Sequence, residues 1–254
     1  MKLTTLPGIS LMLMMSSAGA AEGQVFNDLS DTAPQLQKYT ASVLENDLWK
    51  RPQLAPRERS MVTLAALIAD NQSAQLPQEV NRALDNGVKP VELSGIITQL
   101  AFYTGWPGAM SAVSVARKIF QERNIDAASL TLPDGDLLPV DEESEAKRAA
   151  AVRDNVTPTA PELAKYTDEV LFADLWRRKD LSPRDRSLVT MAALITRGQS
   201  EQLTFHLNRA MDNGLTQEEA GEVITQLAFY AGWPDAMSAI TVAKKVFETR
   251  KKIQ

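Results

Sequence analysis

The sequence has 254 residues, of which 44% are hydrophobic and 23% are charged, and its formal net charge is −5. That length suits one large domain or two domains of about 100 residues each. The chain has no cysteine and one histidine, which excludes disulfides, thiolate chemistry and a multi-histidine metal site, and it has no Lys/Arg stripe that would indicate a nucleic-acid partner.

The first 20 residues are typical of a secretory signal peptide. Lys2 gives the positive start, residues 9–15 form a short apolar run, and Ala18-Gly19-Ala20 matches an A-x-A cleavage signature. The apolar run is much shorter than the roughly 20 residues that span a bilayer. We therefore predict cleavage between Ala20 and Ala21 and a mature protein that is periplasmic or secreted and free of the membrane. The alternative is an uncleaved, disordered N-terminus.

The remainder of the chain contains the same sequence twice. The run LAPRERSMVTLAALI, which begins at Leu54, returns at Leu181 as LSPRDRSLVTMAALI. Further on, ITQLAFYTGWPGAMSA returns as ITQLAFYAGWPDAMSA. From residue 54 to residue 120, about 40 of 67 positions are identical at a constant offset of about 127 residues. We infer a duplication, with a first repeat at residues 21–121 and a second at residues 160–254.

The segment between the repeats, residues 122–159, has a different composition. Leu132-Pro133-Asp134-Gly135 is a turn sequence, and the stretch TPTAP that begins at Thr157 is rich in Pro and Thr. We predict a linker that contains a short helix near residues 143–153.

Each repeat is predicted to be helical throughout. In the second repeat, Ser182-Pro183 begins a helix whose apolar residues follow three-four spacing, and Asn213-Gly214 ends the next helix. Thr216, with Glu219 three residues later, begins another helix with a capping box. Gly232-Trp233-Pro234 interrupts the pattern before a last helix. Because no run alternates as a half-buried strand does, the predicted fold class is all-α.

The motifs PRDRSLVT, NRAMDNG and ITQLAFYAGWPDAMSA resemble those of the carboxymuconolactone decarboxylase family, in the same superfamily as alkylhydroperoxidase D. The resemblance covers both repeats. It implies two tandem alkylhydroperoxidase D-like helical domains and a homo-oligomer, for which a fused pair gives a trimer with a pseudo-sixfold arrangement. It also implies decarboxylation of a lactone acid without any cofactor.

The peroxidase branch of the superfamily carries a C-x-x-C-x-x-x-H motif. In the second repeat its cysteine positions fall on Gln199 and Gln202, and its histidine falls on His206, where the first repeat has Glu79. Glutamine forms neither a thiolate nor a disulfide, so peroxide reduction by this chemistry is excluded.

The second repeat carries the polar side chains that a decarboxylase site needs. Glu222, Gln226 and Tyr230 are four residues apart and share one helix stripe, whereas His206 lies on the preceding helix with Arg209. If those two faces meet, they line one pocket. We predict His206 and Glu222 as catalytic residues. The predicted substrate-binding residues are Arg186, Arg209, Gln226, Tyr230 and Trp233, and no metal is predicted.

In this hypothesis Arg186 or Arg209 binds the substrate carboxylate as a bidentate pair. His206, oriented by Glu222, then protonates the carbanion that remains when carbon dioxide leaves. The first repeat has Gly95 in place of Glu222 and is predicted to be a structural or substrate-shaping partner. The alternatives are a histidine that is only packed and arginines that only form ion pairs.

Two functions from different classes are compatible with these residues. The first is a lyase that acts on a small carboxylated lactone or β-keto acid, and His206 together with Glu222 favours it. The second is a non-catalytic exported ligand-binding or oligomeric scaffold protein. The missing cysteines, the degenerate first repeat and Gln226 favour the second, because many sequences of the decarboxylase branch have a histidine at the position of Gln226. The export signal counts against the standard role in aromatic catabolism. We prefer the enzyme.

Overall fold

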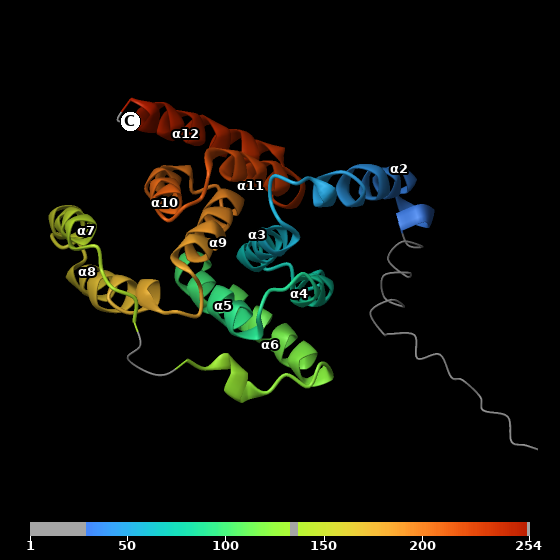
Figure 1. Ribbon diagram of the computed structural model, residues 1–254, viewed down its shortest axis with the longest axis horizontal. Helices are drawn as coiled ribbons and strands as arrows, with labels where there is room; N and C mark the ends of the chain where they lie inside the picture. Colours follow the sequence, from blue (N-terminus) through green and yellow to red (C-terminus); the bar gives the residue numbers. More distant parts are fainter. Residues whose placement is uncertain (1–28, 133–136, 253–254) are drawn as a thin grey trace, which may run out of the picture. The chain divides into compact units, whose positions relative to one another are not determined.

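The computed structural model describes residues 29–132 and 137–252, and its elements are helices (Figure 1). Across those ranges no strand is formed, and the one strand-like feature is an isolated bridge between Leu137 and Arg178. The predicted all-α fold is thereby confirmed. The predicted signal peptide and its cleavage point at Ala20 lie outside the described residues.

The helices occur as two copies of one series, separated by a linker. The first copy comprises α2 (Pro34–Tyr39), η1 (Thr40–Glu45), η2 (Leu48–Lys50), α3 (Pro56–Ala69), α4 (Leu76–Asp85), α5 (Pro90–Thr104) and α6 (Trp106–Glu122). The second comprises α8 (Pro161–Tyr166), η4 (Thr167–Phe172), η5 (Leu175–Arg177), α9 (Pro183–Thr196), α10 (Ser200–Asp212), α11 (Gln217–Tyr230) and α12 (Trp233–Lys251). The duplication in the sequence is therefore a duplication of tandem helical domains.

The helix ends carry the capping groups that the sequence predicts. The Ser182 hydroxyl accepts a hydrogen bond from the backbone N–H of Asp185 at the start of α9. Thr216 and Glu219 form a reciprocal capping box at the start of α11. Gly214, which follows α10, has a φ of 97°, a conformation that side chains with a Cβ rarely adopt.

Residues 1–47 and 48–254 form two units. The described part of the first contains α2 and η1. In the second, α3 and α9 lie at the centre and pack on each other (Figure 1). Both are buried on all sides from their second turn onward, which explains why their apolar residues are not confined to one stripe.

The two repeats interlock around this central pair of helices. Helix α5 of the first repeat packs on α9 of the second, and α11 of the second packs on α3 of the first. Helix α10, in contrast, packs on α9 and α12 of its own repeat. Polar residues on α5 and α11 consequently face the other repeat.

The linker contains η3 (Ala127–Leu130) and α7 (Glu142–Asn155), which confirms the predicted short helix. Helix α7 buries Arg148, whose guanidinium bonds Asp168 at 2.8 Å and lies 4.3 Å from the ring centroid of Phe172. The linker helix is thus fastened to the start of the second repeat. Among the described residues, none of the helices combines the length and apolar character that crossing a membrane requires.

Candidate functional site

Two clusters of buried polar side chains lie where the repeats meet, and they occupy equivalent positions in the duplication. Each is centred on a fully buried arginine, Arg59 in α3 or Arg186 in α9. The Arg59 cluster comprises Trp49, Arg51, Arg59, Thr63, Glu79, Arg82, Glu222, Gln226 and Tyr230. The Arg186 cluster comprises Gln99, Tyr103, Trp176, Arg178, Asp180, Arg186, Thr190, His206 and Arg209.

In the Arg59 cluster the central guanidinium bonds two residues of α11. Arg59 donates to Gln226 Oε1 at 2.9 Å and to Glu222 Oε1 at 2.7 Å, and Gln226 donates to Thr63 Oγ1 at 3.1 Å. Arg51 adds a bidentate pair to the same Glu222 carboxylate, at 2.8 and 3.1 Å. Burial raises the pKa of Glu222, but the hydrogen bonds from Arg51 and Arg59 outweigh burial and hold that pKa below its ordinary value.

An aromatic pair completes the Arg59 cluster. Trp49 donates from its indole Nε1 to the Tyr230 hydroxyl at 3.0 Å. The guanidinium carbon of Arg82 lies 4.4 Å from the centroid of the Trp49 ring, within cation–π range. Arg82 also pairs with Glu79, one turn earlier on α4, at 3.8 Å.

The Arg186 cluster repeats these hydrogen bonds with the repeats exchanged. Arg186 donates to Gln99 Oε1 at 2.9 Å, and Gln99 donates to Thr190 Oγ1 at 2.9 Å. Trp176 Nε1 donates to the Tyr103 hydroxyl at 2.9 Å. The glutamine and tyrosine therefore come from α5 of the first repeat, and the other partners come from the second.

The carboxylate of the Arg186 cluster has a different origin. Gly95 stands at the position equivalent to Glu222, and the loop before α9 supplies Asp180, which accepts a hydrogen bond from Arg186 Nη2. A Cβ atom on Gly95 would lie 3.0 Å from Asp180 Cγ. Asp180 thus occupies the space that a side chain at position 95 would need.

His206 lies in the Arg186 cluster among aromatic rings. It is 7% exposed, stacks on Trp176 with centroids 5.7 Å apart, and meets Tyr103 edge to face at 5.1 Å. Its buried Nδ1 has no hydrogen-bond partner among the residues that the structure describes. Burial and, to a lesser degree, the charge of Arg209 lower the pKa of His206 to about 3, so the imidazole is neutral near pH 7.

Arg209 is a partly buried cation whose neighbours are aromatic. Its guanidinium carbon lies 4.3 Å from the Trp176 ring centroid and 5.6 Å from that of Phe172. Within residues 29–132 and 137–252 it forms no ion pair, and its buried Nε has no hydrogen-bond partner. Burial lowers the pKa of Arg209. By contrast, Arg186 is already bonded to Asp180.

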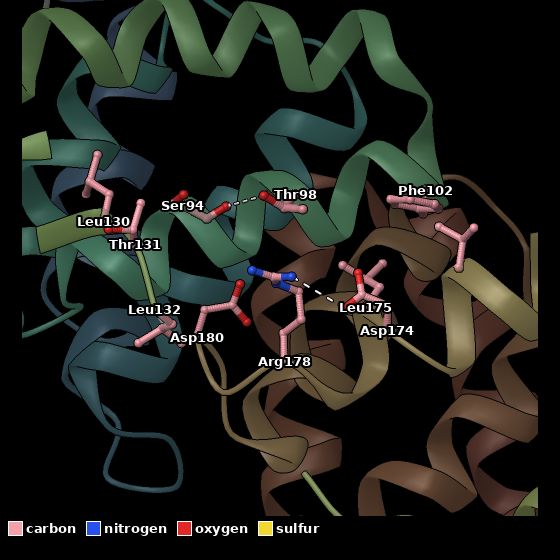
Figure 2. Close-up of a pocket in the computed structure, with 11 residues that line it drawn as sticks. Ser94, Thr98, Phe102, Leu130, Thr131, Leu132, Asp174, Leu175, Arg178 and Asp180 are labelled. Atoms are coloured by element: carbon pink, nitrogen blue, oxygen red, sulfur yellow. Dashed lines mark hydrogen bonds and ion pairs between the residues drawn. The ribbon is translucent and has the colours of Figure 1, made fainter. Parts of the chain in front are cut away.

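His206 also lines a cavity of about 300 Å³. The other lining residues are Phe102, Tyr103, Thr104, Leu194, Arg197, Gln199 and Gln202. A second cavity, of about 400 Å³, lies on the Asp180 side of the cluster. Figure 2 shows Ser94, Thr98 and Phe102 along α5 facing Asp174, Arg178 and Asp180 across this cavity. Phe102 lines both cavities.

The structure divides the predicted site residues between the two clusters. His206, Arg186 and Arg209 lie in the Arg186 cluster, whereas Glu222 lies with Arg51 and Arg59. Gln226 and Tyr230 accompany Glu222. The prediction that His206 and Glu222 share a pocket therefore needs correction, because α11 packs its polar stripe on α3 of the other repeat and α10 does not meet that stripe.

Trp233 is in neither cluster. It is 57% exposed at the start of α12 and packs against Phe229, with ring centroids 5.0 Å apart. Tyr103, Gln99, Trp176 and Asp180 were absent from the predicted site. The repeat alignment shows the first two as counterparts of Tyr230 and Gln226, but no pattern within one repeat indicates that α5 faces the other repeat.

Among the described residues, no group of three or more His, Asp or Glu side chains is arranged to hold a metal ion. The polar groups of the Arg186 cluster include a phenol, a neutral imidazole, three guanidinium groups and the Asp180 carboxylate. Burial raises the pKa of Tyr103, which keeps the phenol protonated and able to donate a hydrogen bond.

Comparison with known proteins places both repeats in one family. Residues 34–118 and residues 161–245 each match the carboxymuconolactone decarboxylase family. A segment of 95 residues, 37% of this chain, is 30% identical to 4-carboxymuconolactone decarboxylase from Acinetobacter baylyi and covers 71% of that protein. Another of 91 residues, 36% of this chain, is 30% identical to nitrosuccinic acid decarboxylase from Metarhizium robertsii and covers 64% of it. The chain belongs to the carboxymuconolactone decarboxylase family and contains its domain twice.

Proposed function

We propose that this protein is a cofactor-independent decarboxylase of a small carboxylated lactone or β-keto acid, and that the Arg186 cluster is its active site. The observation that carries the proposal is Arg209, a partly buried guanidinium without an ion-pair partner among the described residues, beside a neutral His206 whose Nδ1 is unpartnered. A buried cation of this kind favours an anionic ligand. The relatives named as decarboxylases supply the reaction type.

In the proposed site Arg209, and not Arg186, is the carboxylate anchor. Arg186 already donates to Gln99, to the Arg178 carbonyl and to Asp180, so its role is to hold α5 against α9. The site is then shared between the repeats, since Tyr103 comes from the first and His206 from the second. This modifies our prediction of a site within the second repeat alone.

The reaction then proceeds through an enolate. The bond between the substrate carbon and its carboxylate breaks, carbon dioxide leaves, and the electron pair stays on the substrate as an enolate. Tyr103 donates a hydrogen bond to the developing oxyanion. The neutral imidazole of His206 relays the proton, accepting one from water at one ring nitrogen as it gives the proton of the other to the carbon. The hydroxide that remains combines with the carbon dioxide as bicarbonate.

Turnover of a panel of carboxylated lactones and β-keto acids tests this proposal. We expect His206→Ala to lose activity by about a hundredfold or more, which is the usual contribution of a general acid. Tyr103→Phe should also lose activity, whereas the matched variant Tyr230→Phe, in the Arg59 cluster, should keep it. Equal losses in the two tyrosine variants, or full activity in His206→Ala, would contradict the assignment.

One observation favours the second function, a non-catalytic ligand-binding protein. With a pKa of about 3, His206 is not an imidazolium near neutral pH and has no extra proton to donate. Such a protein would bind carboxylates through Arg209 without turning them over. The same panel separates the two functions, because binding without product formation in any substrate favours the binding protein.

We further propose that copies of the chain associate, as a trimer with a pseudo-sixfold arrangement. Support comes from two equivalent stripes of exposed apolar side chains, one on α6 and one on α12. They consist of Trp106, Met110 and Val113, and of Trp233, Met237 and Ile240. Light scattering of the purified protein measures the mass, and Met237→Glu is expected to reduce it; a monomeric wild-type protein would contradict the proposal.

Export remains a proposal that rests on the N-terminal sequence. Mass spectrometry of the protein recovered from cell fractions is expected to find a chain that begins at Ala21, outside the cytoplasm. Recovery of the intact chain from the cytoplasm would contradict it.

A further inference from the structure

We propose that the difference between Glu79 of the first repeat and its counterpart His206 in the second decides which of the two clusters binds a carboxylate ligand. In this proposal the Arg59 cluster is a second carboxylate site that is closed by its own Glu79, and removal of that charge opens it. The inference rests on the proposed function only for the choice of carboxylates as the ligand class.

An arginine, a tryptophan and a tyrosine are arranged in the same way in both clusters. Arg82 lies 4.4 Å from the Trp49 ring centroid, and Arg209 lies 4.3 Å from that of Trp176. Each tryptophan donates to a tyrosine hydroxyl of the other repeat, at 3.0 and 2.9 Å. The two sites thus present a guanidinium, an indole and a phenol in the same arrangement.

The residue beside this arginine has a different charge in the two clusters. Glu79 and His206 occupy equivalent positions on α4 and α10, and each is 7% exposed. The Glu79 carboxylate pairs with Arg82 at 3.8 Å, whereas His206 is neutral and cannot balance the charge of Arg209.

The neighbouring charges do not remove this difference. The central arginine of each cluster has one carboxylate partner, the buried Glu222 for Arg59 and the partly exposed Asp180 for Arg186. The more exposed Arg51 and Arg178 stand at equivalent positions, and each pairs with a carboxylate, Glu222 or Asp174. Because Glu222 serves both Arg59 and Arg51, three guanidinium groups face two carboxylates in each cluster, and the clusters differ in where the excess positive charge lies. In the Arg186 cluster it lies on Arg209, since the two carboxylates that act on Arg209 from farther away, Glu145 and Asp212, are paired with Arg148 and Arg250.

A carboxylate on the same helix is a strong competitor for a dissolved ligand. Glu79 is three residues from Arg82, a spacing that brings their side chains together on one helix face. Its effective concentration next to Arg82 is therefore far above that of a small acid in solution. A ligand at Arg82 competes with Glu79, whereas no carboxylate of the described residues forms an ion pair with Arg209.

The two tryptophans allow each cluster to be observed separately. The indole N–H signals of Trp49 and Trp176 in a two-dimensional NMR spectrum report the Arg59 and Arg186 clusters, and Trp→Phe variants assign them. We choose succinate as the probe, with sodium chloride at equal ionic strength as the salt control. In the wild-type protein, succinate is expected to shift the Trp176 signal and leave Trp49 in place.

Three variants test this difference. Glu79→Gln and Glu79→His are expected to make the Trp49 signal respond to succinate, at concentrations within about tenfold of those that saturate Trp176. His206→Glu is expected to weaken the response of Trp176 by about tenfold or more. Glu201→Gln, which removes an exposed negative charge from α10, is the control and should change neither response.

Each outcome either supports or contradicts the proposal. A wild-type protein in which both signals respond alike, or in which neither responds, overturns the proposal. So does a Trp49 signal that stays silent in both Glu79 variants while their spectra remain those of a folded chain. If one Glu79 variant fails to fold, the other and His206→Glu still decide. Absence of turnover with a responding Trp176 signal would count against the proposed enzyme and leave this inference standing.

Discussion

In the Arg59 cluster the buried guanidinium bonds a carboxylate from helix α11, whereas in the Arg186 cluster the carboxylate comes from the loop before α9. The remaining hydrogen bonds, from arginine to glutamine to threonine and from tryptophan to tyrosine, are the same. A buried guanidinium needs a nearby anion, because an isolated charge in the interior is strongly unfavourable. In both clusters a carboxylate lies beside the buried guanidinium, but a different element of the chain supplies it.

The largest difference between the clusters should appear when their central arginines are removed. Arg59→Met leaves Glu222, which is 4% exposed, with Arg51 as its remaining cation. We expect the free energy of unfolding to fall by about 3–5 kcal/mol. Arg186→Met leaves Asp180, which lines a cavity and can be hydrated, so we expect a smaller loss of about 2–3 kcal/mol. Urea denaturation measures both, and a larger loss for Arg186→Met would contradict the comparison.

Substitutions at Gly95 test whether a side chain at this position and the Asp180 side chain compete for the same space. A Cβ atom there would lie 3.0 Å from Asp180 Cγ and from Leu181 Cγ, so Gly95→Ala is expected to cost about 1–3 kcal/mol. Gly221 is the control, because a Cβ atom there meets nothing within 4 Å and Gly221→Ala should stabilise α11 by about 0.4–1 kcal/mol. Urea denaturation again gives both values.

The double variant Gly95→Glu with Asp180→Gln sharpens the same test. It gives the Arg186 cluster the carboxylate arrangement of the Arg59 cluster, in which Gln53 is the counterpart of Asp180, and we expect it to be more stable than Gly95→Glu alone. A double variant that is less stable than both single variants would mean that the two carboxylate positions are not interchangeable.

The sequence predicted the helices well, because their signals are local. Ser182, Thr216 and Gly214 lie at helix ends and act on residues next to them in the chain, so the sequence alone predicts each of them. The duplication likewise predicted equivalent positions in the two repeats. These features depend on residues that are close in the chain.

The pairing of the helix faces was not predictable in the same way. The spacing of Glu222, Gln226 and Tyr230 shows that they share a face, but it does not say which helix that face meets. A duplicated chain offers two partners with nearly identical sequences, α3 and α9. The polar stripe of α11 bonds Arg59, on α3, and this choice separates Glu222 from His206.

The pH dependence of stability should also differ between the clusters. The pKa of His206 is about 3 in the folded chain and near 6.5 when it unfolds, so the unfolded state binds an extra proton between these values. Stability is therefore lost as the pH falls below about 6.5, by up to about 1.4 kcal/mol per pH unit. Because His206 is the one histidine of the chain, the variant His206→Gln should remove this component.

The signal of the His206 ring in a proton NMR spectrum checks the same point directly. We expect no titration between pH 5 and pH 8 in the folded chain. A midpoint near pH 6.5 would mean that the imidazole is hydrated, and the argument from its burial would fail.

The smallest difference should come from the two hydroxyl groups that accept from tryptophan. Tyr103→Phe leaves the indole N–H of Trp176, which is 4% exposed, without its acceptor, and we expect a loss of about 1 kcal/mol. Tyr230→Phe does the same to Trp49, which is only partly buried and can turn to water, so its loss should be smaller. Thermal unfolding of the two variants side by side measures this difference. Equal losses would show that hydration does not distinguish the two indoles.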